Sequence, residues 1–135
     1  MNSNNTPLAI LLLFSAVISF WDAFTTFVGI DDVIGSSFIA LVFTVAINGL
    51  LYSTFRVWNN DSDLGILGIV IKIAWLISII CDLYTSYLGN MDFSGIESAE
   101  PSQAFILVCF TFITSVSPII VSYLVFKKGL LNEFV

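Results

Sequence analysis

The chain has 135 residues, of which 58% are hydrophobic and only 10% are charged, and its mean hydropathy is +1.00. Soluble domains carry about 25% charged residues, so this composition excludes a soluble globular enzyme, a disordered tail and a nucleic-acid binder. The net charge of −6 arises without any histidine, which removes the commonest general base and transition-metal ligand. Cys81 and Cys109 lie inside apolar runs and form no CxxC pair, which argues against a disulfide scaffold or a zinc site. We therefore expect no enzymatic activity, no catalytic residue and no cofactor.

Four apolar runs follow one another along the chain, separated by short polar connections. Each run is longer than the roughly 20 residues that cross the hydrocarbon core of a bilayer. A segment inside lipid must satisfy its own backbone hydrogen bonds, so each run is expected to be a helix. We therefore predict an all-α integral membrane protein with a single domain, residues 1–135. Its four transmembrane helices form a bundle and comprise residues 7–30, 36–58, 64–88 and 102–126.

The few basic residues predict the orientation of the bundle. The first run has no basic residues before it and is longer than the apolar region of a signal peptide, about 7–15 residues, so we expect it to be retained. Arg56 lies near the end of the second run, and Lys127 and Lys128 follow the fourth. The positive-inside rule places these residues in the cytoplasm. Both termini are then cytoplasmic, and the acidic hairpin loops at residues 31–35 and 90–101 face outward.

An internal repeat relates the two halves of the chain. Residues 21–29 match residues 81–89 in the pattern Asp-x-aromatic-Thr-[Thr/Ser]-aromatic-x-Gly. A weaker match relates residues 38–44 to residues 105–111. We therefore predict a duplicated two-helix hairpin with pseudo-twofold symmetry about an axis along the membrane normal. The two copies are residues 7–58 and 64–126.

The first and third runs each carry one polar stripe. The polar and small residues recur at helical spacings of three and four, which places them on one face of each helix. Faces that contact lipid are not polar, so both stripes are expected to face the protein interior. Because the first and third runs share an orientation, their aspartates should lie at similar depth. The stripes consist of Ser15, Ser19, Asp22, Thr26 and Gly29, and of Ser78, Asp82, Thr85, Ser86 and Gly89.

The repeated aspartates are the candidate site. A carboxylate inside a bilayer costs on the order of 3 kcal/mol, so two at matching positions favour a function. Oxygen ligands suit a hard cation of unspecified identity, and two close carboxyl groups also suit a shared proton. The alternative is structural, with the aspartates bonded to hydroxyls that fix the helix arrangement. The predicted cation or proton ligands are Asp22, Thr25, Thr26, Asp82, Thr85 and Ser86.

Lys72 is a secondary candidate inside the third run. One interpretation is a lysine whose stem lies along the helix while its ammonium group reaches the cytoplasmic interface. The other interpretation is a charge that lines an internal cavity. In the repeat, the position that matches Lys72 is Leu12, which argues against an essential role.

The leading hypothesis is a small membrane protein that binds or translocates a cation or a proton at the paired aspartates. The alternative is a non-catalytic accessory or assembly subunit of a larger membrane complex, since the chain has no substantial soluble part. A pore-forming lytic protein of the holin type is a third possibility. The expected partners are the lipid bilayer, further copies of the chain or a larger membrane complex, and a cation, with no nucleic acid.

Overall fold

The computed structural model describes residues 6–59 and 64–126, and over these ranges the chain is helical and contains no strand. The helices α1 (Thr6–Ile34), α4 (Gly65–Phe93) and α5 (Pro101–Phe126) are long and apolar enough to cross a membrane. A shorter apolar helix, α2 (Ser37–Tyr52), and the short helix α3 (Thr54–Asn59) lie between α1 and α4 in the chain. The predicted all-helical fold is therefore confirmed, and three of the four predicted spans are long and apolar enough to cross a membrane.

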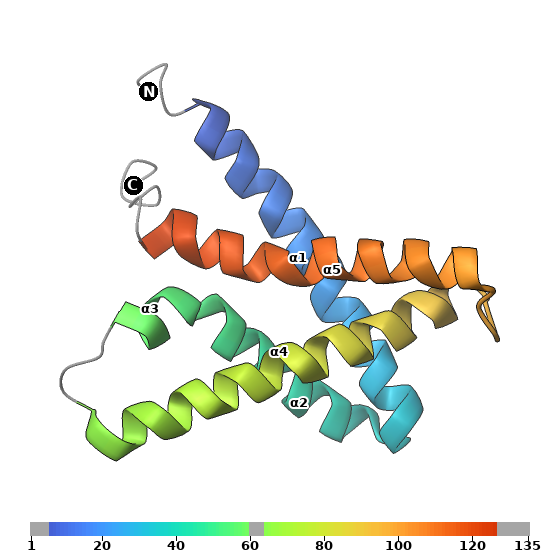
Figure 1. Cartoon of the computed structure of the whole chain (residues 1–135), viewed down its shortest axis with the longest axis horizontal. Coiled ribbons are helices and arrows are strands. Elements are labelled where there is room, and N and C mark those ends of the chain that lie inside the picture. The colour runs from blue at the N-terminus through green and yellow to red at the C-terminus, as the bar shows by residue number, and fades with distance from the viewer. Residues whose placement is uncertain (1–5, 60–63, 127–135) are drawn as a thin grey trace.

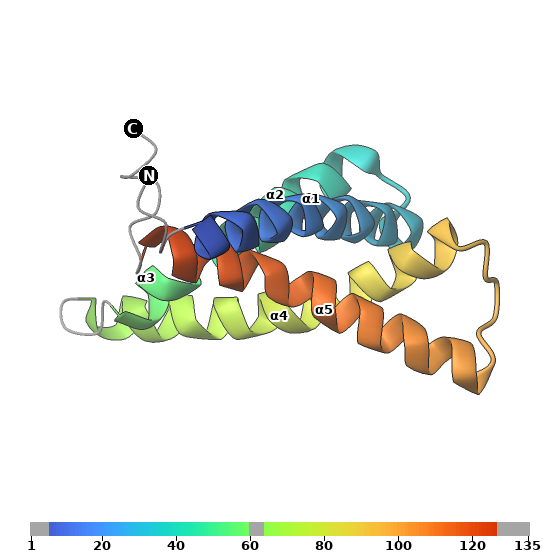
Figure 2. The same ribbon diagram turned by 90° about the horizontal axis from the view of Figure 1, so that it is seen from above.

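The helices form a bundle whose successive members alternate in direction. Figure 2 shows α1 and α4 running the same way, while α2 and α5 return. Figure 1 shows α1 and α4 crossing in the middle of the molecule, and α1 packs more extensively against α4 than against any other helix. The α1–α2 and α4–α5 turns lie at one end, and α3 lies at the other (Figure 2). This crossing brings the two polar stripes into contact.

The bundle is polar inside and apolar outside. The exposed surface is aliphatic and aromatic, with Phe20 77% exposed and Ile66 81% exposed. Lipid tails are as apolar as leucine, so contacts between polar and small side chains hold membrane helices together. The exposed surface therefore indicates contact with the bilayer. The buried polar residues, by contrast, come from every long helix and include Ser15, Ser19, Asp22, Thr25, Thr26, Asp82, Ser86, Asn90, Thr111, Thr114, Ser115, Ser117 and Ser122.

The helix ends differ from the predicted ones at both hairpins. The first and third runs were expected to end at residues 30 and 88, but α1 continues to Ile34 and α4 to Phe93. The acidic residues Asp31, Asp32 and Asp92 therefore belong to the last turns of helices and not to loops. A glycine with a positive φ follows the end of each of these two helices. Gly35 (φ +69°) comes directly after α1, and Gly95 (φ +65°) comes two residues after the end of α4. Glycine adopts this left-handed conformation without the penalty of a Cβ.

The second run is interrupted, which corrects the prediction of one continuous helix over residues 36–58. α2 ends at Tyr52 after 16 residues, and α3 begins at Thr54. At 1.5 Å per residue α2 is about 24 Å long, shorter than the hydrocarbon core of about 30 Å. Side chains replace the lost helical bonds at the break. The Thr54 hydroxyl donates to the Leu51 carbonyl, and the Phe55 amide donates to Ser122 Oγ of α5 at 3.1 Å.

Candidate functional site

Two glycines bring α1 and α4 into backbone contact. A Cβ added at Gly29 would lie 1.9 Å from the carbonyl oxygen of Thr85, and one added at Gly89 would lie 2.0 Å from that of Thr25. Neither position therefore accepts any side chain while the helices stay in place. Small residues separated by one helical turn are typical of closely packed transmembrane helices. The contacts are reciprocal, because each glycine meets the threonine four residues before the other.

Beside this crossing, hydroxyl groups connect the two predicted aspartates. The Thr26 hydroxyl of α1 lies 2.7 Å from Asp82 Oδ1 of α4 and donates to it. The Ser86 hydroxyl of α4 lies 3.1 Å from Asp22 Oδ1 of α1. The two hydroxyls lie 2.7 Å from each other. Each aspartate is thus bonded by the other helix, and a continuous row of polar groups crosses the interface.

The two carboxyl groups are buried and are linked through two hydroxyl groups. Asp22 is 0% exposed and Asp82 is 1% exposed, and the hydroxyls of Thr26 and Ser86 join them across the interface. Within the described ranges, no hydrogen-bond donor reaches the buried Oδ2 atom of either aspartate. Two carboxyl groups that are shielded from water and joined by so few groups are costly to ionise at the same time.

α5 contributes a hydrogen-bond donor that the sequence analysis did not include among the candidates. Ser115 Oγ donates to Asp22 Oδ1 at 2.9 Å. Pro118 lies inside α5 and has no amide proton to donate to the carbonyl of Thr114, and the Ser117 hydroxyl donates to this carbonyl instead. Ser117 also accepts from Ser19 of α1 at 2.9 Å. The serines around Pro118 were the only sequence signal for this contribution.

The remaining predicted ligands mainly bond their own helix. Thr25 Oγ1 donates to the carbonyl of Asp22 at 3.0 Å and lies 3.4 Å from Ser86 Oγ. Thr85 Oγ1 donates to the carbonyl of Cys81 at 2.8 Å. Hydroxyls in helix interiors often bond the carbonyl three or four residues earlier. The geometry therefore separates Thr26 and Ser86, which touch the carboxyl groups, from Thr25 and Thr85.

Lys72 lies apart from the carboxyl pair. Its Nζ is 5.2 Å from the ring centroid of Trp58 in α3, and its side chain is partly exposed. At 1.5 Å per residue, Lys72 is about 15 Å from Asp82 along α4. Arg56 lies at the same end of the bundle, 4.7 Å from the ring of Phe126. This position suits an interfacial lysine better than a ligand of the pair.

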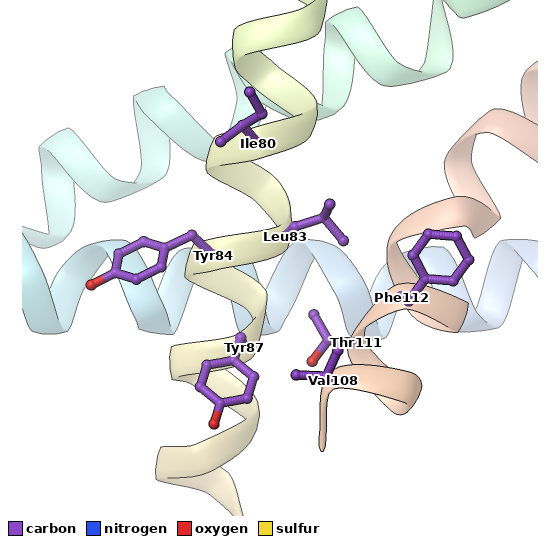
Figure 3. Close-up of a pocket in the computed structure, with 7 residues that line it drawn as sticks. All are labelled: Ile80, Leu83, Tyr84, Tyr87, Val108, Thr111 and Phe112. Atoms are coloured by element: carbon purple, nitrogen blue, oxygen red, sulfur yellow. The ribbon is translucent and has the colours of Figure 1, made fainter. Parts of the chain in front are cut away.

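Two cavities adjoin each other next to the site. A small one of about 40 Å³ touches Asp82 and Ser115 and is otherwise lined by apolar side chains. A larger hollow of about 380 Å³ lies between α4 and α5 and is lined almost entirely by apolar groups (Figure 3). Leu83 and Phe112 line both cavities. The two cavities therefore meet at these two side chains.

No group of three or more His, Cys, Asp or Glu residues within residues 6–59 and 64–126 is placed to hold a metal ion. The polar ligands at the pair are hydroxyls, which accept and donate hydrogen bonds. No protein-family model, curated protein or solved structure matches this chain.

Proposed function

We propose that this protein binds or translocates a cation or a proton at the Asp22–Asp82 pair. The observation that carries the proposal is the burial of two carboxyl groups from different membrane helices, joined by the hydroxyls of Thr26 and Ser86. Charged groups at the centre of a bilayer cost about 2.5–3.5 kcal/mol each on insertion scales and typically mark ion or proton pathways. The proposed activity involves no enzymatic reaction.

We further propose that the pair lies on a pseudo-twofold axis between two copies of a helical hairpin. The contacts of Gly29 and Gly89 support this symmetry, because exchanging the two copies converts one contact into the other. The bonds from Thr26 to Asp82 and from Ser86 to Asp22 are related in the same way. In this arrangement α2 crosses the membrane as well as α1, α4 and α5. Both termini are cytoplasmic. Further copies of the chain cover part of the apolar exterior.

The adjoining cavities support a route to the pair between α4 and α5. The hollow between these helices and the cavity at Asp82 share Leu83 and Phe112 as lining residues. We propose that a change of rotamer at either side chain connects the two cavities and so controls access to the pair.

Neutralising either carboxyl group tests the proposal. Asp22→Asn and Asp82→Asn keep the side-chain volume but remove the charge. Each is expected to abolish uptake of cations or protons by vesicles that contain the purified protein. If a metal cation binds, it should stabilise the wild type against heating by about 2.7 kcal/mol at a hundredfold excess over Kd. Neither variant should show this stabilisation.

Asp32→Asn is the matched control, because Asp32 lies in the same helix and is exposed. It should keep wild-type uptake. A double variant of Asp22 and Asp82 that inserts normally and retains wild-type uptake or binding would contradict the proposal. Obligate copurification with a second membrane protein would then support the accessory-subunit alternative.

A further inference from the structure

Four oxygen-bearing groups form a row across the interface of α1 and α4. Their order is Asp82, Thr26, Ser86 and Asp22, and the successive oxygen–oxygen distances are 2.7, 2.7 and 3.1 Å. All three distances are in the range of hydrogen bonds between oxygen atoms, or at its edge. All four side chains are buried, so water does not compete for these contacts.

The row needs one more proton than its hydroxyls supply. A hydroxyl donates one proton and an ionised carboxylate donates none. Three contacts therefore share only two donors if both aspartates are ionised. Ser115 makes a separate bond to Asp22, and the Thr25 hydroxyl is directed to a backbone carbonyl. Neither supplies the missing donor between Thr26 and Ser86. A single proton on one carboxyl group completes all three bonds.

We infer that the pair holds one proton and that Thr26 and Ser86 relay it between the two aspartates. This inference rests on the proposed function and specifies the ligand of the same site. In one state the proton is on Asp82. Asp82 then donates to Thr26, Thr26 donates to Ser86, and Ser86 donates to Asp22. In the other state the proton is on Asp22, and each of the three hydrogen bonds runs in the opposite direction. The contact between Thr26 and Ser86 accepts either direction.

The transfer between the two states balances at every oxygen. The Asp82 O–H bond breaks as its proton bonds to Thr26 Oγ1. Thr26 releases its own proton to Ser86, and Ser86 releases its own proton to Asp22 Oδ1. Each hydroxyl ends with one proton, and the negative charge moves from Asp22 to Asp82. No oxidant or further reactant takes part.

The surroundings favour a proton over a metal cation as the ligand. The adjoining cavity of about 40 Å³ is lined by apolar surface, whereas hard cations take about six or more oxygen ligands. A proton needs no such shell. It also fits the hydroxyls, which act as donor and acceptor in turn.

Removing one hydroxyl at a time tests the relay. Thr26→Val and Ser86→Ala interrupt the row and leave both carboxyl groups in place. Each is expected to reduce proton flux on the order of a hundredfold. The flux is measured with a trapped pH-sensitive dye in vesicles that contain choline as the only added cation. Thr85→Val is the matched control, because it removes an adjacent hydroxyl that bonds its own helix. The exchange Thr26→Ser with Ser86→Thr should keep the flux.

Infrared spectroscopy tests the shared proton without transport. The wild type at neutral pH should show the absorption of one protonated carboxylic acid. Asp22→Asn and Asp82→Asn should each remove it, because the amide group of asparagine supplies the missing donor and leaves the other aspartate ionised. Absence of the band from the wild type, or its persistence in both variants, would overturn the shared proton.

The outcomes separate this inference from the proposed function. Full flux in Thr26→Val and Ser86→Ala, with flux lost in the aspartate variants, would overturn the relay and leave the proposed function intact. Uptake of sodium or potassium without proton flux would overturn both the shared proton and its relay and leave the proposed function intact. Wild-type flux in both aspartate variants would overturn both.

Discussion

At the scale of single residues, the absence of two Cβ atoms determines how closely α1 and α4 approach. Gly29 and Gly89 each face a backbone carbonyl of the other helix. Backbone cannot move aside as a side chain does, so a methyl group at either position must push the helices apart. The hydroxyl contacts at 2.7 Å lie beside this crossing and tolerate little displacement. The glycines therefore position the carboxyl pair without touching it.

Gly29→Ala should destabilise the bundle by about 1–3 kcal/mol, the usual cost of overpacking. The same variant should lose the activity of the pair. Gly49→Ala is the control, because a Cβ at Gly49 meets nothing within 4 Å and alanine favours a helix. Thermal unfolding of the two purified variants in detergent measures the difference. Equal stability of the two variants would show that the helices do not pack this closely.

At the scale of helices, the break between α2 and α3 depends on α5. The Phe55 amide donates to Ser122 Oγ, and the Thr54 hydroxyl accepts from Trp75 Nε1 of α4 at 2.8 Å. Neighbouring helices thus satisfy the groups that the interruption frees, as inside lipid they must. α3 is anchored to the bundle by these two bonds.

Ser122→Ala should leave the part-buried Phe55 amide without its acceptor, at a cost of about 1 kcal/mol, the usual net contribution of a hydrogen bond. Hydrogen exchange at the amides of α3 should become faster, while exchange in α1 stays unchanged. Ser102→Ala, an exposed change in the same helix, serves as the control. Unchanged exchange in α3 would show that Ser122 does not hold the break.

The features predicted from the sequence and those missed differ in their physical basis. Hydropathy depends on local composition, so it located the apolar helices, and helical spacing located the inward stripes that carry Asp22 and Asp82. Hydropathy did not predict the break at Ser53, because the hydrogen bonds that permit the break come from distant residues such as Ser122. The role of Ser115 was not predicted either, since its contact with Asp22 depends on how α5 is rotated. Spacing alone also did not distinguish Thr26 from Thr85, whose hydroxyl is directed to its own backbone.

At the scale of the whole molecule, the described residues at the two ends of the bundle differ in charge. One end carries Asp31, Asp32 and Asp92 near the hairpin turns, and the other carries Arg56 and the partly exposed Lys72. The positive-inside rule counts basic residues near span ends, and the orientation we propose therefore places the end with α3 in the cytoplasm.

Single cysteines placed at exposed positions test this orientation in a variant whose own cysteines, Cys81 and Cys109, are replaced by serine. An impermeant thiol reagent added outside intact cells should label Asp32→Cys and Ser98→Cys. It should not label Asn59→Cys until the membrane is opened. The reverse pattern would invert the bundle and place the acidic turns in the cytoplasm.

Different forces maintain the secondary structure and the helix packing of this protein. The bilayer keeps each segment helical, because an unwound backbone in hydrocarbon costs several kcal/mol for every unsatisfied group. The arrangement of the helices depends on hydroxyl and amide contacts, each contributing on average only about 0.6 kcal/mol in a bilayer. Loss of the arrangement therefore leaves the helices intact. Circular dichroism measures helix content, so its spectrum will stay unchanged in a variant in which α1 and α4 have separated. Each variant therefore also needs a measurement of the distance between these helices.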